Sequence, residues 1–551
     1  MESKPANSIV DAPKEFVSRP EFGPRAPASS GGENKWLPLD PRFRLDPAIF
    51  ERCATSPCAL SAAERLRVVE ATLDRARIDR SPEIRAGLAR LADPHTRLVI
   101  TGQQPGFLGG PLYTLYKAIG AIAAARFLES RTGVAHVPLF WVASEDHDLD
   151  EARTARFPDS SSGCVEFSLP WPAERRPLGS LRIDETAEKV LFLAADHFAA
   201  RRHGRTAREL IDLYRGRDLA SGFEALLLAL LGRHGLLVVE PEALRVAASP
   251  LVRRALRESG ELMARIEEGR LAARASGIEP PVPARFPLFL LDEGQRHHLL
   301  PEGSGDRFLL EGVGRSFSAA ELERLLEQEP ARFSTGVLLR PLIQNVLLPN
   351  AVYLGGPGEI AYFRQLAPIA TWLGLEPPRI AFRPSATLIE GKIARAMRKI
   401  GLDAEHGDRW ASAKEPADLL EPIHAGAQAR LDALAARTRA EALVALASVN
   451  IAPNERSKLE DLVARTAESL SGIARRAGRA EQAARVEEFA SAAKVLDHFF
   501  PAGAAQERVW GPLHPISKYG TGWIDALVEV LARDPFRPGH LWVHFDEGIP
   551  L

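Results

Sequence analysis

Residues Arg97–Lys117 read RLVITGQQPGFLGGPLYTLYK, and this stretch decides the expected fold class. It opens with the apolar run Leu98–Ile100, which is too short for a helix and typical of a buried strand. A glycine-rich segment follows, and Pro111 is then the residue type best suited to a first helical position. The order therefore predicts a strand, a glycine turn and a helix.

The glycine turn is a candidate ligand site. Backbone N–H groups in such a turn can point at an anion, and the dipole of the following helix adds to the attraction. Tyr113 and Lys117 lie one turn apart on that helix, which brings a cation to the same end. The alternative is a tight turn that needs glycine only for its geometry, and the spacing matches neither the dinucleotide fingerprint nor the phosphate loop. We favour ligand binding, with these candidates: Thr101, Gly102, Gln103, Gln104, Gly106, Gly109 and Gly110.

A second apolar run, Val137–Ala143, ends in an acidic cluster. Its distance from the first run fits a strand–helix–strand crossover in a parallel sheet, where ligands bind at the carboxyl ends of the strands. The cluster could hold Mg²⁺ through oxygen or Zn²⁺ through His147, bind an amine, or act as a general base. The alternative is a solvated acidic loop. We favour function for Ser144, Glu145, Asp146, His147 and Asp148 because they directly follow a buried strand.

A second strand–glycine–helix unit begins at Ala351–Leu354 and continues into a helix expected at Ile360–Leu373. Glu359 would occupy the first helical turn, where the dipole favours a carboxylate even without a ligand. Two such units could line both sides of one crevice. The candidates here are Gly355, Gly356, Gly358, Glu359 and Tyr362.

Composition limits the class of protein. The 551 residues are enough for several domains, and the formal net charge of −2 gives no reason to expect a nucleic acid or an anionic membrane as partner. Three cysteines (Cys53, Cys58 and Cys164) cannot form a disulfide framework, which indicates a reducing cytoplasm. No apolar run reaches the length of a membrane span.

Local signals predict the other elements. Helices are expected at Ala62–Ala76 and Ser81–Leu91, with Ser61 and Ser81 as N-caps. We also expect strands at Val165–Leu169, Gly179–Ile183, Gly235–Val239 and Arg379–Arg383, and helices at Ala207–Tyr214, Gly222–Arg233, Pro250–Gly269 and Ser334–Leu348.

The chain is expected to be an α/β protein with a Rossmann-like parallel-sheet core. We assign residues 1–35 to a disordered tail, 36–160, 221–275 and 331–386 to the core, 161–220 and 276–330 to two inserts, 387–500 to a helical coiled coil, and 501–551 to a C-terminal segment that packs on the core. That segment could form a second nucleotide site, although we favour a role in tying down the terminus. Its candidates are Gln506, Glu507, Arg508, Lys518, Tyr519 and Gly520.

Five motifs resemble one family. ITGQQPGFLGGPLYTLYK, VPLFWVASEDHD, LLRPLIQNVLLP, YLGGPGEIAYF and AQERVW…KYG occur in the order seen in the bacillithiol biosynthesis cysteine-adding enzyme family, from about Trp36 onward. The resemblance implies a nucleotidyltransferase-like core, connecting-peptide-like inserts and a coiled coil that forms a homodimer. It also implies addition of cysteine to glucosaminyl-malate. One departure is Asn345, where the family often has a carboxylate.

The implied reaction forms an amide, which requires an activated carboxylate. We expect ATP to supply the activation, with Mg²⁺ as a metal to consider and zinc not ruled out. The predicted catalytic residues are Glu145, Asp146, His147, Asp148 and Lys117. Two alternatives stay open: a ligase or nucleotidyltransferase of the same fold with another substrate, and a non-catalytic coiled-coil scaffold.

Overall fold

The computed structural model describes residues 17–18, 58–159, 163–172, 174–303, 305–402, 410, 413–420, 427–537 and 539–545. The chain divides into two compact units, Met1–Ile389 together with Pro501–Leu551, and Glu390–Phe500. The expected tail lies outside the described residues except for β1 (Val17–Ser18), and Cys53 lies outside them as well. The boundaries assigned to the core segments and inserts stay predictions.

The first unit is built on a five-stranded parallel sheet with the strand order β13-β12-β2-β3-β6. Ile100 in β2 lies opposite Leu139 in β3 and Tyr353 in β12. Every pair of neighbours runs parallel, so the carboxyl ends of all five strands share one edge. The strands are β2 (Arg97–Gln103), β3 (His136–Val142), β6 (Leu237–Val239), β12 (Asn350–Gly355) and β13 (Ile380–Phe382).

Helix α4 (Leu112–Thr132) makes the crossover between β2 and β3 and packs on both. The predicted strand–turn–helix–strand order is therefore confirmed. The helix begins one residue later than expected, because Pro111 is its extended N-cap and the Leu112 N–H donates to the Trp510 carbonyl. It ends at Gly133, whose φ of +67° suits a residue without a Cβ.

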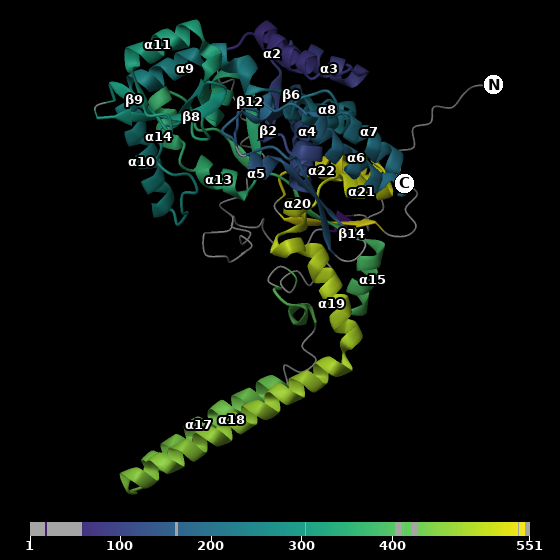
Figure 1. The fold of residues 1–551 in the computed structure, drawn as a ribbon, viewed down its shortest axis with the longest axis vertical. Helices are drawn as coiled ribbons and strands as arrows, with labels where there is room; N and C mark the ends of the chain where they lie inside the picture. Colours follow the sequence, from purple (N-terminus) through teal and green to yellow (C-terminus); the bar gives the residue numbers. More distant parts are fainter. Residues whose placement is uncertain are drawn as a thin grey trace, which may run out of the picture. The chain divides into compact units, whose positions relative to one another are not determined.

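Helices cover the sheet (Figure 1). Helices α2 (Ala62–Arg75) and α3 (Pro82–Leu91) pack on β6, and Ser61 and Ser81 cap them as predicted. Helix α8 (Leu219–Leu231) also contacts β6, while α22 (Gly522–Ala532) packs on α4. No helix within the described ranges combines the length and the apolar content that a membrane span requires.

Residues after β3 form a hairpin, three α-helices and a 3₁₀ helix. These are α5 (Leu149–Ala152), β4 (Thr154–Pro158), β5 (Cys164–Ser168), η3 (Leu178–Ser180), α6 (Glu185–Ala199) and α7 (Gly204–Asp212). The strand expected at Gly179–Ile183 is wrong, because that segment contains a 3₁₀ turn. The Leu178 and Gly179 N–H groups donate to the Asp146 and Ser144 carbonyls, so this backbone bonds to the acidic loop instead of joining a strand ladder.

The first unit also holds a five-stranded antiparallel sheet in the order β10-β9-β8-β7-β11. The helix expected at Ser334–Leu348 is wrong in its first part. Ser334 lies in β11, opposite Phe289 of β7, and the helix α12 (Arg340–Leu347) begins only at Arg340. The strands are β7 (Leu288–Asp292), β8 (Gln295–Glu302), β9 (Arg307–Leu310), β10 (Arg315–Ser318) and β11 (Phe333–Thr335).

Two expected helices are each divided. The Pro250–Gly269 segment belongs to α9 (Arg245–Arg257) and α10 (Ser259–Ala275), separated at Glu258. The Ile360–Leu373 segment belongs to α13 (Pro357–Phe363) and α14 (Ala367–Leu373), because Pro368 lacks an N–H and suits a helix start. The remaining elements of this unit are η2 (Phe107–Gly109), η4 (Gly232–His234), η5 (Pro241–Leu244), α11 (Ala319–Gln328), η6 (Pro330–Arg332), β14 (Ser385–Glu390, ending at the unit boundary), η9 (Pro501–Gly503), α20 (Gln506–Val509), α21 (Leu513–Tyr519) and β15 (His540–Phe545).

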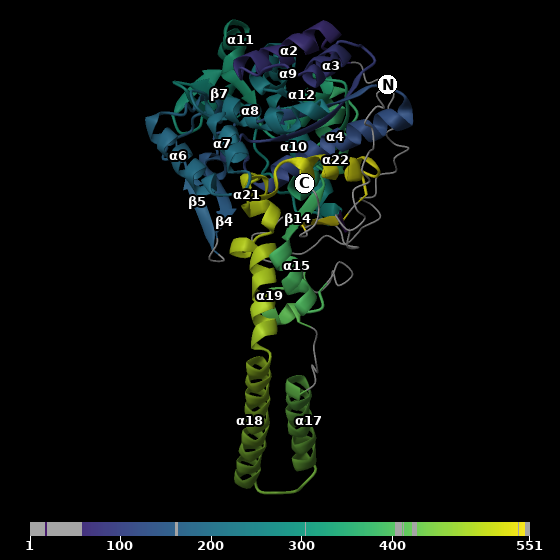
Figure 2. The ribbon, with the colours of Figure 1, turned by 90° about the vertical axis from the view of Figure 1, so that its right-hand side faces the viewer.

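The second unit is mainly helical. Figure 2 shows α17 (Ala427–Ala447) and α18 (Pro453–Ala484) side by side as a hairpin, and the two helices pack along one another. The second helix begins at Pro453. The unit also contains α15 (Gly391–Lys399), η8 (Pro416–Leu419) and α19 (Val486–Phe499).

Helix α8 carries Glu224, a carboxyl group with no solvent exposure. Neither of its oxygens has a hydrogen-bond partner, and the nearest cation is Arg75, 3.5 Å away. Burial raises the pKa of Glu224 to about 8, against the attraction of Arg75. The folded protein therefore holds this carboxyl protonated at pH values where the unfolded chain has released the proton.

We expect Glu224→Gln to become more stabilising, relative to the wild type, as the pH rises from about 5 to about 8. The folded-state pKa is raised, so the contribution of this carboxyl to the free energy of unfolding is fully present below the unfolded pKa. That contribution is lost as the pH rises toward about 8. Each pH unit in this range lowers the free energy of unfolding of the wild type by up to about 1.4 kcal/mol. Urea unfolding at several pH values measures the difference, with the exposed Glu242→Gln as control. A difference independent of pH contradicts the assignment.

Candidate functional site

The carboxyl ends of β2, β3 and β12 open into a hollow of about 380 Å³, which we call the sheet-edge hollow. All three loops expected to converge contribute to it, so the predicted convergence is present in the structure. Its lining consists of Gly102, Gln103, Gln104, Tyr113, Lys117, Ala143, Asp146, Glu151, Pro281, Val282, Val337, Arg340, Gly356, Pro357, Gly358, Glu359, Tyr362, Arg383 and Arg508.

A second hollow of about 320 Å³ lies against the antiparallel sheet, and we call it the insert hollow. It shares Ala143, Asp146, Val282, Val337 and Arg340 with the sheet-edge hollow, so the two adjoin. The predicted Glu145 and His147 line this second space. Its other lining residues are Arg175, Pro283, Arg285, Phe286, Pro287, Phe289, Arg296, His298, Glu311, Thr335, Gly336 and Leu338.

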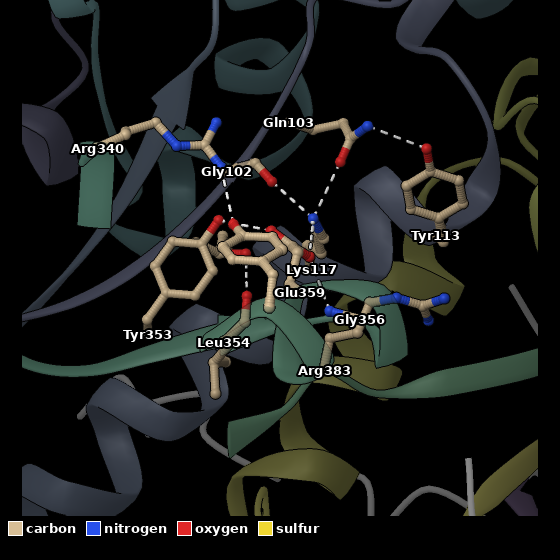
Figure 3. A network of polar contacts seen from close by, with 12 residues as sticks. Gly102, Gln103, Tyr113, Lys117, Arg340, Tyr353, Leu354, Gly356, Glu359 and Arg383 are labelled. Carbon is tan, nitrogen blue, oxygen red and sulfur yellow. Dashed lines mark hydrogen bonds and ion pairs between the residues drawn. The ribbon is translucent and has the colours of Figure 1, made fainter. Parts of the chain in front are cut away.

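Lys117 and Glu359 form a buried ion pair at the base of the sheet-edge hollow (Figure 3). The Lys117 Nζ lies 2.6 Å from Glu359 and also donates to the Gly102 carbonyl at 2.7 Å and to the Gln103 Oε1 at 2.9 Å. These three acceptors match the three N–H donors of an ammonium group. All three N–H donors of the ammonium group are therefore bonded within the protein, and Lys117 links the ends of β2 and β12.

The Glu359 carboxylate is also hydrogen-bonded within the protein. It accepts hydrogen bonds from the Tyr353 hydroxyl at 2.8 Å and from the Gly356 N–H at 2.7 Å. Burial lowers the pKa of Lys117, although Glu359 opposes the shift. Burial disfavours ionisation of Glu359, but Lys117 and these hydrogen bonds hold its pKa below the ordinary value. The carboxylate beside Lys117 and the three donors around Glu359 each favour the charged form of the group that they surround.

The residues next to Lys117 serve close packing between strands. The Thr101 Oγ1 donates to the Leu354 carbonyl at 2.8 Å, which links β2 to β12. A Cβ added at Gly102 would lie 2.8 Å from the Trp141 carbonyl oxygen, so only glycine fits there without movement. Gln103 donates from Nε2 to the Tyr113 hydroxyl at 3.0 Å. Gly355 is buried at the end of β12, and its carbonyl accepts the Arg383 N–H.

The glycine turn does not form the expected anion cradle. The Gly109 N–H is bonded to the Gly106 carbonyl and the Tyr214 hydroxyl, and the Gly110 N–H to the Phe107 carbonyl. Gly109 and Gly110 have φ angles of +91° and +64°, which favour glycine for backbone reasons. These glycines do not line either hollow, so the turn-geometry alternative explains them.

The side chains of the predicted acidic cluster contact different partners and do not gather around one point. Glu145 lies 3.6 Å from Arg245, and Asp148 caps α5 by accepting the Glu151 N–H. Ser144 is buried, and its carbonyl accepts the Gly179 N–H. Among the described residues, no three His, Cys, Asp or Glu side chains form a group that could hold a metal ion. The predicted cluster therefore does not fit a metal held by protein side chains.

Asp146 lies where the two hollows adjoin, and its neighbour His147 lines the insert hollow. The Asp146 carboxylate accepts from the Gln104 Nε2 and from the His147 N–H, both at 2.7 Å. Burial opposes its ionisation, yet Arg296, 3.8 Å away, and these hydrogen bonds hold the Asp146 pKa below the ordinary value. Burial and the same arginine hold the pKa of His147 low. A carboxylate thus lies beside a neutral imidazole.

Sequence reasoning missed five arginines of these hollows, one of which is Arg285 in the segment assigned to the second insert. Arg383 directly follows β13, so the rule that ligands bind at strand ends could have found it. Arg340 begins α12, which was expected to start earlier. Arg175 and Arg296 lie in segments assigned to inserts, and only the tertiary fold brings them to the core. Asn345, the departure from the family pattern, accepts a hydrogen bond from Asn350 and lines neither hollow.

The C-terminal candidates fall into two groups. Glu507 makes a buried two-point ion pair with Arg383 at 2.7 and 3.1 Å and accepts the Ala386 N–H, while Gln506 bonds both backbone groups of Leu388. These contacts attach the segment to β14. Arg508 lines the sheet-edge hollow. Lys518, Tyr519 and Gly520 line neither hollow, and the Tyr519 ring stacks on Phe545.

We expect Lys117→Met to reduce the free energy of unfolding by about 3–5 kcal/mol, because it leaves the Glu359 carboxylate buried without a counter-charge. Urea unfolding measures the loss. The double variant Lys117→Met/Glu359→Gln should lose less than the sum of the two single variants. Additive losses would show that the two side chains do not interact.

We expect Glu507→Gln to speed hydrogen exchange in Gln506–Val509 and in the neighbouring β14 backbone, because Arg383 loses its buried carboxylate. Mass spectrometry of deuterium uptake measures the change. Glu529→Gln, on an exposed ion pair, should change uptake little. Unchanged uptake together with weaker nucleotide binding would instead support the second nucleotide site.

Comparison with known proteins gives a consistent match. The N-terminal Rossmann-like domain described as bacillithiol biosynthesis BshC matches residues 54–384, and the C-terminal coiled-coil domain of the same description matches residues 451–545. Relatives named "Putative cysteine ligase BshC" occur in Heliobacterium modesticaldum (31% identical, covering 80% of this chain and 82% of the relative) and Salinibacter ruber (29%, covering 88% and 90%). The Rossmann-like match alone spans more than half of the chain, so the chain belongs to the bacillithiol biosynthesis BshC family.

Proposed function

We propose that this protein is a cysteine ligase that joins L-cysteine to the amine of glucosaminyl-malate and so forms bacillithiol. Its relatives bear the name of a cysteine ligase, and the family match extends over both the Rossmann-like and the coiled-coil parts. The observation that carries the proposal is the convergence of the family's separate motifs on the sheet-edge hollow. Loops far apart in the sequence meet at the strand edge where such folds bind ligands.

The proposed reaction has two steps. A carboxylate oxygen of cysteine attacks the α-phosphorus of ATP, pyrophosphate leaves, and a cysteinyl adenylate forms. The acceptor nitrogen then attacks the carbonyl carbon, AMP leaves with the electron pair of the broken C–O bond, and the nitrogen releases one proton. Holding the nitrogen against the carbonyl carbon can supply much of the rate without covalent catalysis.

Asp146 and His147 suit the second step. The Asp146 carboxylate can attract the acceptor amine in its ammonium form, which loses one proton to water before the nitrogen attacks. The neutral His147 imidazole, whose Nδ1 lies 3.3 Å from Arg296, can take the second proton, which the nitrogen releases as the amide forms. Burial and Arg296 lower the pKa of His147, while Arg296 and the hydrogen bonds from Gln104 and the His147 N–H lower the pKa of Asp146. Lys117 acts indirectly, since its bonds to Gly102, Gln103 and Glu359 shape the hollow instead of contacting a substrate.

The use of ATP is part of the proposal. Arg508 lines the sheet-edge hollow with an exposed side chain and can meet a phosphate group of ATP there. The described side chains do not fit a protein-held metal, so no step is assigned to bound Mg²⁺ or Zn²⁺. A homodimer formed through the α17–α18 hairpin and a cytoplasmic location also remain predictions.

Two other functions would produce different results. A ligase with another substrate should make an amide with a different amine acceptor but no bacillithiol. A scaffold should bind none of ATP, cysteine or glucosaminyl-malate in isothermal titration. The presence of an ionised Asp146, a neutral His147 and an open hollow favours catalysis over the scaffold.

Purified protein mixed with glucosaminyl-malate, cysteine and ATP–Mg²⁺ should form bacillithiol, detected by mass, with one AMP released per product. We expect Asp146→Ala and His147→Ala to lower the rate by roughly 10²- to 10⁴-fold. Asp150→Ala, which removes an exposed carboxylate from the same loop region, should retain activity. Full activity in both Asp146→Ala and His147→Ala would rule out these roles.

A further inference from the structure

Arg340 occupies a position shared by both hollows. It is the first residue of α12 and lines the sheet-edge hollow as well as the insert hollow. One terminal nitrogen donates to the Tyr362 hydroxyl at 3.0 Å, and Figure 3 shows the guanidinium reaching toward the network around Glu359. Its Nε is buried without a hydrogen-bond partner. Among the residues that the structure describes, no carboxylate forms an ion pair with Arg340.

The other buried cations of the two hollows are committed to protein carboxylates. Lys117 is paired with Glu359, and Arg383 with Glu507. Arg296 lies 3.8 Å from Asp146 and also bonds to Ser334 and Thr335. Arg508 lines the sheet-edge hollow but is exposed, so water solvates its charge. Arg175 in the insert hollow is partly buried as well, but it is paired with Glu311 at 3.5 Å. Among the described residues that line the two hollows, Arg340 is thus the partly buried guanidinium without a carboxylate partner.

The surroundings of Arg340 select the kind of anion. Glu359, Asp146 and Glu151 line the same hollow, so next to Arg340 a group with one negative charge is favoured over a group with several, and the phosphates of ATP would lie at exposed Arg508 instead. One carboxylate matches one guanidinium in charge and can accept two parallel N–H bonds from its planar fork. A lysine could supply the charge at this position but not the paired donors.

We infer that Arg340 binds a carboxylate group of a substrate at the junction of the two hollows, and that Tyr362 is a positioning residue that orients the guanidinium. The inference deepens the proposed function and rests on it for the identity of the substrates. Two substrates carry a carboxylate: the malate portion of the acceptor, and cysteine. The chemistry of recognition is the same for both, so the experiment must separate them.

The test measures binding of L-malate and of L-cysteine, each alone, to the full-length protein by isothermal titration. We expect Arg340→Gln to weaken binding of one of these acids by about tenfold to hundredfold and to leave the other unchanged. Arg340→Lys should fall between Arg340→Gln and the wild type, because it retains the charge without the fork. Tyr362→Phe should weaken the same acid by a smaller factor.

Arg253→Gln, which changes a half-buried arginine of α9 that lines neither hollow, is the matched control and should bind both acids like the wild type. Thermal melting of each variant verifies folding, and Arg340→Lys keeps the test valid if Arg340→Gln does not fold. Unchanged binding of both acids by folded Arg340→Gln or Arg340→Lys would overturn the inference. Absence of bacillithiol with the wild type would overturn the proposed function instead, because binding is measured without the reaction.

Discussion

The buried ion pair between Lys117 and Glu359 is the contact on which the site depends. An ammonium group taken out of water must have each of its N–H donors satisfied, and here Glu359, the Gly102 carbonyl and the Gln103 side chain satisfy them. The carboxylate in turn orders Tyr353 and the start of α13. Two strand ends far apart in the sequence are therefore held at a fixed separation, and the hollow between them keeps its shape.

The distribution of charge in the two hollows follows from this arrangement. Protein carboxylates neutralise most of the buried cations. These cations therefore support the lining of the hollows and are not free to bind a ligand. An ionised Asp146 beside a neutral His147 gives the junction both an attraction for an amine and a base. The junction of the two hollows, lined by Asp146 and Arg340, therefore suits a substrate that carries an amine and a carboxylate together.

Local signals in the sequence predicted the elements that depend on neighbouring residues. The buried strands, the crossover helix and the caps at Ser61 and Ser81 all follow from apolar runs and from side chains that bond their own backbone. The errors at Gly179–Ile183 and Ser334 arose where the backbone bonds to distant segments, the acidic loop in one case and β7 in the other. No local pattern reports such a partner.

The sequence by itself determined the family, the α/β class and the loops that meet at the strand edge, because motifs, apolar periodicity and the rule of strand ends are local properties. Only the tertiary structure decided which side chains face the hollow. In the folded protein, Lys117 and Glu507 form ion pairs, and the glycines of the first turn serve backbone geometry. Arg340 and Arg296 lie at the site although they are distant in the sequence. The physical reason is that the cost of burying a charge depends on the partner that folding places beside it.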